Sequence, residues 1–379
     1  MVAIRKKNIQ KDKKIAAVLF ILPNLHGGGA ERVVLNVIRR LDRNKFKPIL
    51  FLFKNEGVYW DEVPNDVSVI TAIQPGQRIF VHSIKILYKL IDVSRRSDIL
   101  VGALELTATY YAAFVGKLLK KPAIGWIHTD LRFYAPAKKR PHKWILKLTY
   151  PFLTKAIAVS DGVKDASLEV IPKLKNKICV IYNPFEMERA IELSQTSLEL
   201  NIDRPIIMGI GRLSYEKGFD ILIAAHAILR NRGRKYQLII LGEGQERKSL
   251  EETIKRLNLQ DSVWLVGFQE NPFAWLKHAS VFVLSSRFEG FGMVLIEALA
   301  LGIPCISFDC PSGPSEILGK EYGVMVPSLN AESLANAIDQ VMNDISLRDA
   351  LSKKGPNRAR EFAPEVTVPQ FERLLLDLL

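Results

Sequence analysis

Two basic residues in one glycine-rich stretch have the types and the spacing to bind a diphosphate. Residues 209–218 read GIGRLSYEKG and place Arg212 and Lys217 five positions apart, between a predicted strand and a predicted helix. Arginine offers a planar fork of donors and lysine a compact charge, and both suit phosphate oxygens. Gly211 permits the tight turn before them. Arginine and lysine on a loop are often only solvated, so this stretch alone leaves that alternative open.

Two carboxylates follow further along the chain. Residues 285–297 read SSRFEGFGMVLIE, so Glu289 lies in a loop after a predicted strand and Glu297 lies inside the next predicted helix. The amides that open this helix, where N–H groups and the helix dipole favour anions, belong to Gly290, Phe291 and Gly292. Glu297 has apolar neighbours and therefore needs a polar partner, which ribose hydroxyls or a structural salt bridge could supply.

The N-terminal half contributes another glycine-rich turn and a histidine. Residues 25–32 read LHGGGAER, and Gly28 and Gly29 permit either the close approach of a ligand or simply a tight turn. His128 follows the predicted strand 123–127. Parallel α/β sheets bind ligands at the carboxyl ends of their strands, although a histidine satisfied in the core would show the same pattern.

Alternating strand and helix patterns must position these residues, and they predict an α/β fold with parallel sheets. The first predicted series of strands covers residues 15–22, 49–53, 67–73, 98–103, 123–127 and 156–159. The second covers residues 206–210, 237–241, 263–266, 281–284 and 304–307. Because the alternation of strands and helices begins again at residue 206, the sequence predicts two Rossmann-like domains, residues 1–185 and 186–363. A polar linker is predicted at 186–204 and a helical tail at 364–379.

Composition narrows the choice of partners. The chain has 379 residues with a net charge of +13. Residues 1–185 hold 32 Lys and Arg against 14 Asp and Glu, whereas the remainder holds 21 against 26. A one-sided basic domain indicates anionic lipid or nucleic acid. In residues 132–152, lysines and arginines alternate with aromatic residues, which predicts either an interfacial segment on an anionic membrane or a solvated basic helix over a packed face.

Other features are excluded or set aside. The apolar run 15–22 follows a basic stretch, but no small-residue cleavage site accompanies it, so a buried first strand is favoured over a signal peptide. No apolar run is long enough for a membrane-spanning helix. Cys179, Cys305 and Cys310 form no CxxC pair, which indicates a reducing compartment.

Together, these stretches resemble the GT-B retaining glycosyltransferases of family 4 (glycosyl transferases group 1). The motifs that carry the resemblance are Glu289-x7-Glu297, Gly211-Arg212 with Lys217-Gly218, glycines 27–29, and the segments 300–307 (ALGIPCIS) and 310–318 (CPSGPSEIL). The resemblance covers nearly the whole chain. It implies two Rossmann-like domains facing each other across a cleft, with residues 364–379 forming a helix that crosses back to the first domain.

The resemblance also implies roles. Arg212 and Lys217 would hold the donor diphosphate and stabilise the departing nucleotide. Glu289 would bind donor-sugar hydroxyls, and Glu297 would bind the ribose. The candidate catalytic residues are His128, Arg212, Lys217 and Glu289, and the candidate donor-binding residues are Gly28, Gly29, Gly211, Phe268, Gly290, Phe291, Gly292 and Glu297.

Two of these assignments have plain alternatives. Phe268 stands where the family places the nucleotide base, mostly through backbone contacts, but a core aromatic would fit equally. His128 stands where the family commonly places a histidine near the donor sugar, and Asp130 beside it is a weaker candidate.

The predicted activity is a retaining transfer of a hexose or N-acetylhexosamine. The segment 310–318 looks like members that use UDP-sugars, so we expect UDP over GDP or ADP. Because the chain contains no Asp-x-Asp, we expect no metal and no cofactor. The expected acceptor is a membrane-associated glycan or lipid-linked saccharide, as in polysaccharide or lipopolysaccharide biosynthesis. The expected location is cytoplasmic, peripheral at the inner face of the cell membrane.

Two other classes of function remain at this point. A GT-B nucleotide-sugar epimerase or a non-catalytic nucleotide-sugar-binding module would share the donor motifs. A nucleic-acid-binding protein is suggested only by charge, and no helix-turn-helix, RNA-recognition or zinc-finger signature supports it. We therefore expect no nucleic-acid partner.

Overall fold

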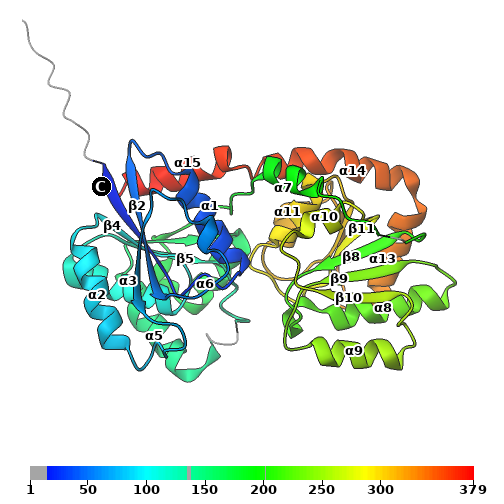
Figure 1. Ribbon diagram of the computed structural model, residues 1–379, viewed down its shortest axis with the longest axis horizontal. Helices are drawn as coiled ribbons and strands as arrows, with labels where there is room; N and C mark the ends of the chain where they lie inside the picture. The colour runs from blue at the N-terminus through cyan, green and yellow to red at the C-terminus, as the bar shows by residue number, and fades with distance from the viewer. Residues whose placement is uncertain (1–14, 135–137, 201) are drawn as a thin grey trace, which may run out of the picture.

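The first half of the chain folds around a seven-stranded parallel sheet (Figure 1). The computed structural model describes residues 15–134, 138–200 and 202–379. The strands lie in the order β3-β2-β1-β4-β5-β6-β7. Their bounds are β1 (Ala16–Leu22), β2 (Phe46–Lys54), β3 (Ser68–Ile73), β4 (Ile99–Gly102), β5 (Ala123–Ile127), β6 (Lys155–Ala158) and β7 (Ile178–Val180).

The second half repeats this plan with a six-stranded parallel sheet in the order β10-β9-β8-β11-β12-β13. Its strands are β8 (Ile206–Ile210), β9 (Gln237–Leu241), β10 (Val263–Gly267), β11 (Val281–Leu284), β12 (Cys305–Phe308) and β13 (Val324–Val326). In both sheets the strand order reverses beside the first strand, between β1 and β4 and between β8 and β11. Parallel α/β sheets bind ligands outside such a reversal.

Helices cover both faces of each sheet (Figure 1). Those of the first half are α1 (Gly29–Arg40), α2 (Ser83–Arg95), α3 (Thr107–Leu119), α5 (Arg140–Thr149) and α6 (Asp161–Val170). Those that follow are α7 (Met187–Ser194), α8 (Phe219–Asn231), α9 (Arg247–Arg256), α10 (Pro272–Leu276), α11 (Met293–Ala300), α12 (Pro314–Leu318), α13 (Ala331–Asn343), α14 (Ile345–Arg360) and α15 (Pro364–Leu376).

Strand β1 shows why an unbroken apolar run forms the centre of the first sheet. Successive side chains of a strand point to opposite faces. Val18 and Phe20 belong to the core that includes α1 and α15, whereas Leu19 and Ile21 belong to the core that includes α2 and α3. Both faces of the strand are therefore buried, which requires apolar residues at consecutive positions.

The predicted fold class is confirmed: the chain has two Rossmann-like domains with parallel sheets. The predicted strand 15–22 is β1, so the signal-peptide alternative is not needed for this run, and the basic stretch before it lies outside the described residues. The polar stretch 186–204 is not an extended linker throughout. Its first part forms α7, which buries Met187 and Ala190 and packs against α10 and α11.

The C-terminal helices connect the two domains along one side of the molecule (Figure 1). Helix α14 packs against α11 in the second domain, and α15 packs against α1 in the first. Phe371 of α15 lies 6.1 Å from the ring of Phe20 and 5.1 Å from that of Trp126. The chain therefore returns to the first domain through apolar packing.

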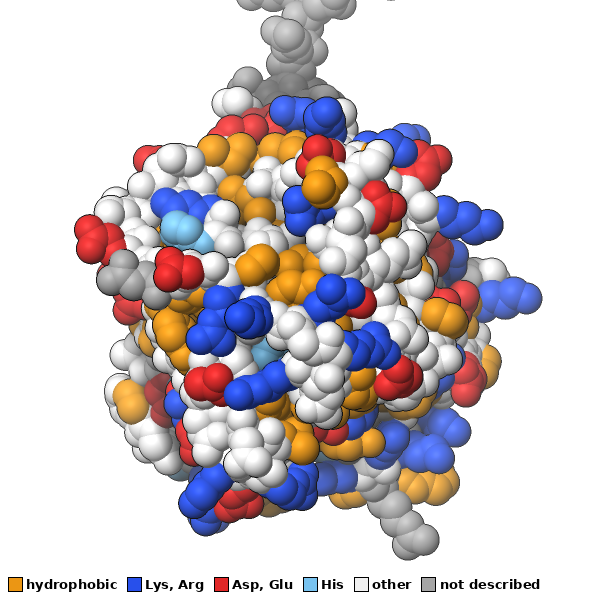
Figure 2. Space-filling view, turned by 90° about the vertical axis from the view of Figure 1, so that its right-hand side faces the viewer, with side chains coloured by type: hydrophobic (Ala, Val, Ile, Leu, Met, Phe, Trp, Pro, Cys, Tyr) orange, Lys and Arg blue, Asp and Glu red, His pale blue; other side chains and the backbone are white. Residues whose placement is uncertain are grey.

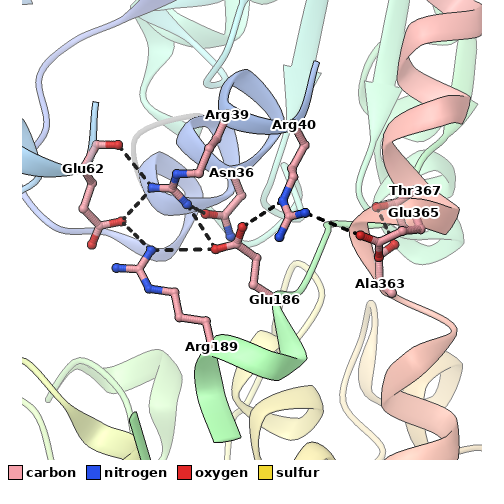
Figure 3. A network of polar contacts seen from close by, with 9 residues as sticks. All are labelled: Asn36, Arg39, Arg40, Glu62, Glu186, Arg189, Ala363, Glu365 and Thr367. Carbon is pink, nitrogen blue, oxygen red and sulfur yellow. Dashed lines mark hydrogen bonds and ion pairs between the residues drawn. The ribbon is translucent and has the colours of Figure 1, made fainter. Parts of the chain in front are cut away.

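A buried carboxylate fastens the point where the chain leaves the first domain (Figure 3). Glu186 accepts hydrogen bonds from Arg39 and Arg40 of α1, each at 3.1 Å, and Arg189 of α7 lies 3.7 Å away. Arg40 also pairs with Glu365 at the start of α15. Removing one partner from a buried ion pair leaves an uncompensated charge, so this network fixes both chain crossings relative to α1.

Candidate active site

A cleft of about 1560 Å³ lies between the two domains and beneath the carboxyl ends of both sheets. All the candidate catalytic and donor-binding residues predicted from the sequence line it: Gly28, Gly29, His128, Gly211, Arg212, Lys217, Phe268, Glu289, Gly290, Phe291, Gly292 and Glu297. These residues are up to 269 positions apart in the chain, between Gly28 and Glu297. The two strand-order reversals bring them together, since β1 and β8 each deliver their following loop to the same opening.

Lys217 and Glu289 form the best-defined polar contact in the cleft. The Lys217 ammonium lies 2.6 Å from Glu289 Oε1, which also accepts a hydrogen bond from the Ser286 hydroxyl at 2.6 Å. Glu289 is buried, so this pairing satisfies a charge that burial would otherwise destabilise. The ammonium can donate three hydrogen bonds and is partly exposed, which leaves it able to contact an anion in the cleft as well.

Arg212 is exposed in the cleft, and no ion pair is found for its guanidinium within the described chain. Glu31 in the first turn of α1 lies on the opposite wall. Burial raises the pKa of Glu31, and the positive charge of Arg212 opposes that rise. The guanidinium of Arg212 forms no ion pair among the described residues, so it is available to bind an incoming phosphate in the cleft.

The loop before α11 adds backbone donors. Gly292 has φ of +97°, a conformation that favours glycine, and is the N-cap of α11. No side chain caps this helix, so its first amides face the cleft side without a side-chain partner. Helix N-termini of this kind stabilise anions. Phe291 itself is buried and stacks on Tyr182 at 5.1 Å, so its contribution to the cleft is through its backbone.

Gly290 brings the two domains into contact at the cleft. A Cβ atom at this position would lie 1.8 Å from the carbonyl oxygen of His128. The Gly290 carbonyl accepts a hydrogen bond from Ser160 of the first domain at 2.7 Å. Glycine is therefore required here by the close approach of the opposite wall rather than by its own backbone conformation.

His128 is held neutral. Burial lowers its pKa to about 4, although Glu105 and the Ala103 carbonyl act in the opposite direction. Its Nε2 lies 3.2 Å from the Ala103 carbonyl oxygen. A carbonyl only accepts, so Nε2 carries the proton and Nδ1 is the acceptor. Within the described chain Nδ1 is buried and has no hydrogen-bond partner, so a hydroxyl group that reached it would supply the missing donor.

Glu105 is a cleft residue that the sequence reasoning missed. Its carboxylate accepts the His128 amide at 3.1 Å and the Thr129 hydroxyl at 2.7 Å. It therefore fixes the backbone that carries His128. Glu105 follows β4 as His128 follows β5. The rule that ligands bind at the carboxyl ends of parallel strands, which identified His128, therefore could also have identified Glu105.

The remaining candidates differ in their surroundings. Glu297 is half-buried in α11, and burial raises its pKa while Arg32 opposes the rise. Phe268 is exposed in the cleft, so the alternative of a core aromatic is wrong for this residue. Asp130 does not line the cleft. It is buried, pairs with Arg132 at 2.6 Å and accepts a hydrogen bond from Ser312 of the second domain, which is a structural role.

The basic aromatic segment 132–152 is divided by the fold. Phe133 stacks on Phe288 across the cleft at 5.3 Å, and Tyr134 lines the cleft. Tyr150 is fully buried, and its hydroxyl accepts the Leu106 amide. Of its aromatic side chains, only Trp144 and Phe152 lie exposed outside the cleft. Residues 135–137 of this segment lie outside the described residues.

Two further observations concern metals and membranes. In residues 15–134, 138–200 and 202–379, no three His, Cys, Asp or Glu side chains gather as a metal-binding group. Within the same part of the chain, no helix combines the length and apolar character needed to cross a bilayer.

Comparison with known proteins identifies both halves of the chain. Residues 191–358 match the family described as glycosyl transferases group 1. Residues 27–189 match the family described as glycosyltransferase family 4. The two matches meet close to the start of the second domain and together span both walls of the cleft.

Relatives agree with this result. The chain is 27% identical, over 89% of its length and 93% of the relative's, to an N-acetylgalactosamine-N,N'-diacetylbacillosaminyl-diphospho-undecaprenol 4-alpha-N-acetylgalactosaminyltransferase of Campylobacter jejuni. It is 34% identical to an uncharacterized glycosyltransferase of Methanocaldococcus jannaschii, over 53% of this chain and 58% of that protein.

Solved structures show the same architecture. The crystal structure of Anabaena HepE in complex with UDP-glucose superposes with a TM-score of 0.79 at 20% identity, covering 96% of this chain and all of that one. A lipopolysaccharide outer core galactosyltransferase, WaaB, superposes with a TM-score of 0.68 at 21% identity, with 96% and 100% covered. The family matches, the named relatives and the shared fold lead to one conclusion: this chain is a glycosyltransferase of the GT-B fold.

Proposed function

We propose that this enzyme is a retaining transferase that moves a hexose or N-acetylhexosamine from a UDP-sugar to a membrane-associated glycan or lipid-linked saccharide. One observation carries the proposal. Arg212, Lys217 and the uncapped start of α11 converge on a single cleft that also contains the half-buried Glu297. This set supplies positive charge for a diphosphate and a carboxylate for a ribose in one place.

That arrangement supports the following reaction. The bond between the anomeric carbon and the donor phosphate oxygen breaks, and its electron pair goes to the β-phosphate. Arg212, Lys217 and the α11 amides stabilise the developing charge, because fixed dipoles and cations need no reorganisation during the reaction. The acceptor hydroxyl attacks the same face of the anomeric carbon, and its proton passes to the departing phosphate. The products are the glycoside and UDP.

The other residues orient the sugar. Glu289, fixed by Lys217 and Ser286, accepts hydrogen bonds from donor-sugar hydroxyls. Neutral His128 accepts another through Nδ1. The cations and amides already available at the diphosphate support a transfer that requires no metal ion.

Retention and the acceptor class draw support from relatives. The C. jejuni relative is named as forming an α product on a diphospho-undecaprenol substrate, and a second one as an alpha-1,4-N-acetyl-D-galactosaminyltransferase acting on a PP-undecaprenol glycan. UDP-hexoses carry an α-linked phosphate, so an α product corresponds to retained configuration. A lipid-linked acceptor would place this enzyme at the inner face of the cell membrane, in the cytoplasm.

Calorimetric titration with UDP, GDP and ADP tests the donor site. We expect UDP to bind most tightly and Glu297→Ala to weaken it at least about tenfold, a loss of roughly 1.4 kcal/mol for the ribose contact. Glu252→Ala, on the exposed face of α9, is the matched control and should bind UDP as the wild type does. Equal affinity of the wild type and Glu297→Ala for UDP would overturn the assignment.

Transfer itself needs a second measurement. With the preferred UDP-sugar, UDP should form only when acceptor is present, and NMR of the product should show the donor's anomeric configuration. A new nucleotide-sugar without acceptor would indicate an epimerase, and UDP binding without turnover on any acceptor would indicate a binding module. An inverted product would refute retention while leaving the donor site intact.

A further inference from the structure

The outer surface of the first domain exposes large apolar side chains on one face of α2. Phe80, just before the helix, and Ile84 and Tyr88 within it stand four residues apart and are 91%, 82% and 77% exposed. Residues at this spacing lie above one another on a helix. The opposite face of α2 buries Ile86 and Leu90 against the sheet. The helix is therefore apolar on two sides, although only one side meets the core.

The two neighbouring helices extend this surface. Leu118 of α3 and Trp144 and Leu148 of α5 are also exposed, Trp144 by 75%. Helix α3 lies between the other two, because the Tyr111 hydroxyl donates to the Ser83 carbonyl of α2 and the Tyr110 ring stacks on His142 of α5. We call the surface formed by Phe80, Ile84, Tyr88, Leu118, Trp144 and Leu148 the three-helix face. Figure 1 shows its three helices on the same side of the first domain.

The charge around this face is nearly all positive. The three helices contain seven Lys and Arg residues and a single acidic residue, Asp92. Lys85, Lys143 and Lys147 are exposed, and among the described residues none of them forms an ion pair. Apolar side chains interleaved with unpaired cations are typical of helices that lie in the headgroup region of an anionic bilayer.

The end of the molecule formed by the second domain has a different surface. Figure 2 looks onto the end formed by the second domain, where positive and negative side chains are interspersed. In the second domain, Arg232 pairs with Glu332 and Arg234 pairs with Asp339. Scattered apolar residues and mixed charges are ordinary on a protein surface, whereas an extended apolar face is a mark of an interaction site.

We propose that the three-helix face docks on a lipid bilayer that contains anionic lipid. This inference rests on the proposed function in one respect, since a lipid-linked acceptor makes such docking useful. The face continues to the cleft, because Lys138, two residues before α5, lines the cleft and its ammonium lies 5.6 Å from the ring centre of Phe133. Docking would thus place the acceptor side of the cleft at the membrane surface.

Charge decides between a bilayer and a second copy of this chain. Two copies joined through this face would bring their unpaired lysines together, and like charges brought together repel. An anionic lipid surface instead attracts each lysine, and the apolar side chains enter the acyl boundary. The sequence-based segment 132–152 covers only the α5 part of this face, and nothing in the sequence reasoning pointed to α2 or α3.

Vesicle co-sedimentation of the full chain tests the proposal, with vesicles free of any saccharide acceptor. The wild type should bind vesicles of equal parts phosphatidylglycerol and phosphatidylcholine, and bind phosphatidylcholine alone far less. The pair Ile84→Glu/Tyr88→Glu and the pair Lys143→Glu/Lys147→Glu should each lower the bound-to-free ratio at least about tenfold. The matched control Ile345→Glu/Lys353→Glu changes an apolar residue that is 63% exposed and a lysine on α14, and should bind as the wild type does.

Several results would overturn the proposal. They are failure of the wild type to bind anionic vesicles, equal loss in the α14 control, or unchanged binding by the α2 variant. Light scattering that shows a wild-type dimer converted to a monomer by the α2 variant would assign the face to self-association instead. UDP titration of the same samples separates the two proposals: vesicle binding without UDP binding leaves docking intact and refutes the donor site, and the reverse result refutes docking alone.

Discussion

The two walls of the cleft offer a ligand different chemistry. The wall from the second domain supplies fixed charges: Arg212, Lys217, Glu289 and Glu297. The wall from the first domain supplies a glycine turn and the neutral His128, which is positioned by Glu105, and it also carries the charged side chains of Glu31 and Lys138. A nucleoside diphosphate carries charge that must be matched, whereas sugar hydroxyls need directed neutral hydrogen bonds. In the proposed function, the second domain would therefore recognise the donor, and the first domain would orient the sugar and the acceptor hydroxyl.

The outer surfaces of the two domains differ in the same direction. The second domain pairs Arg232 with Glu332 and Arg234 with Asp339, while α2, α3 and α5 of the first domain have cations beside exposed apolar residues. Each domain is thus matched to a different environment. If the two domains divide the work in this way, substitutions on the two walls should differ in their effects on the transfer rate and on UDP affinity.

The largest effect should come from Arg212→Ala on the charged wall. This change removes a cation at the diphosphate that is exposed and holds no structural ion pair, so the fold should be unaffected. We expect the transfer rate to fall about 10³-fold, since preorganised charge acts on the developing phosphate negative charge. Steady-state kinetics with saturating UDP-sugar measures it. Arg232→Ala, on the far surface of the same domain, should retain the wild-type rate, and an equal loss there would argue against a specific role.

A substitution that disturbs the contact between the two walls should have the next largest effect on the transfer rate. Gly290→Ala places a methyl group against the His128 carbonyl and must push the domains apart. A displacement of about 1 Å costs about 10²-fold in rate when reacting groups are held in position. Gly162→Ala tests the same idea outside the cleft, because its Cβ would lie 2.6 Å from Ser312 Cα of the second domain. If Gly162→Ala leaves the rate unchanged, the loss at Gly290 is a local effect rather than one of domain separation.

A smaller effect is expected from His128→Gln on the wall formed by the first domain. Losing one neutral hydrogen bond to a hydroxyl should lower the rate about tenfold, or roughly 1.4 kcal/mol. Affinity for UDP alone should not change, because the charged wall is intact. Calorimetry and kinetics on the same variant measure the two quantities. A loss of UDP affinity equal to the loss of rate would break the proposed division between the walls.

The free energy of unfolding should depend on pH through two buried histidines, His128 in the cleft and His226 in the core of the second domain. Burial lowers the pKa of both His128 and His226 to about 4. The unfolded chain binds protons near pH 6.5 that the folded chain does not, so stability is full above that pH. It should fall as pH decreases from about 6.5 to about 4, by up to about 1.4 kcal/mol per pH unit for each histidine.

His226→Gln provides the comparison. It should remove part of this slope in urea unfolding curves recorded across that pH range, while the transfer rate at pH 7 stays at the wild-type value because His226 lies in the core of the second domain. A rate loss as large as that of His128→Gln would show that the effect of either histidine is structural.

The charged wall was the part of the site most accessible to sequence reasoning. Arg212 and Lys217 share one loop, and Glu289 and Glu297 share one loop and helix, so their spacing in sequence nearly fixes their spacing in space. The first-domain wall was less accessible. Glu105 and His128 lie 23 residues apart on separate strand ends, and only the pairing of β4 with β5 brings them together.

Other features depended wholly on tertiary contacts. The aromatic residues of segment 132–152 look alike in sequence, yet Tyr150 is core, Phe133 faces the cleft and Trp144 faces outward. Asp130 is two residues from His128 in the sequence, yet its carboxylate pairs with Arg132 and accepts a hydrogen bond from Ser312 instead of facing the cleft.

By itself, the sequence determined the two α/β domains and the donor motifs, because strand alternation, glycine turns and charge spacing are local properties of the chain. The tertiary structure alone decided the domain contact at Gly290, the role of Glu105 and the three-helix face. Each of these depends on which surfaces remain uncovered, or come within contact distance, after segments distant in sequence have packed.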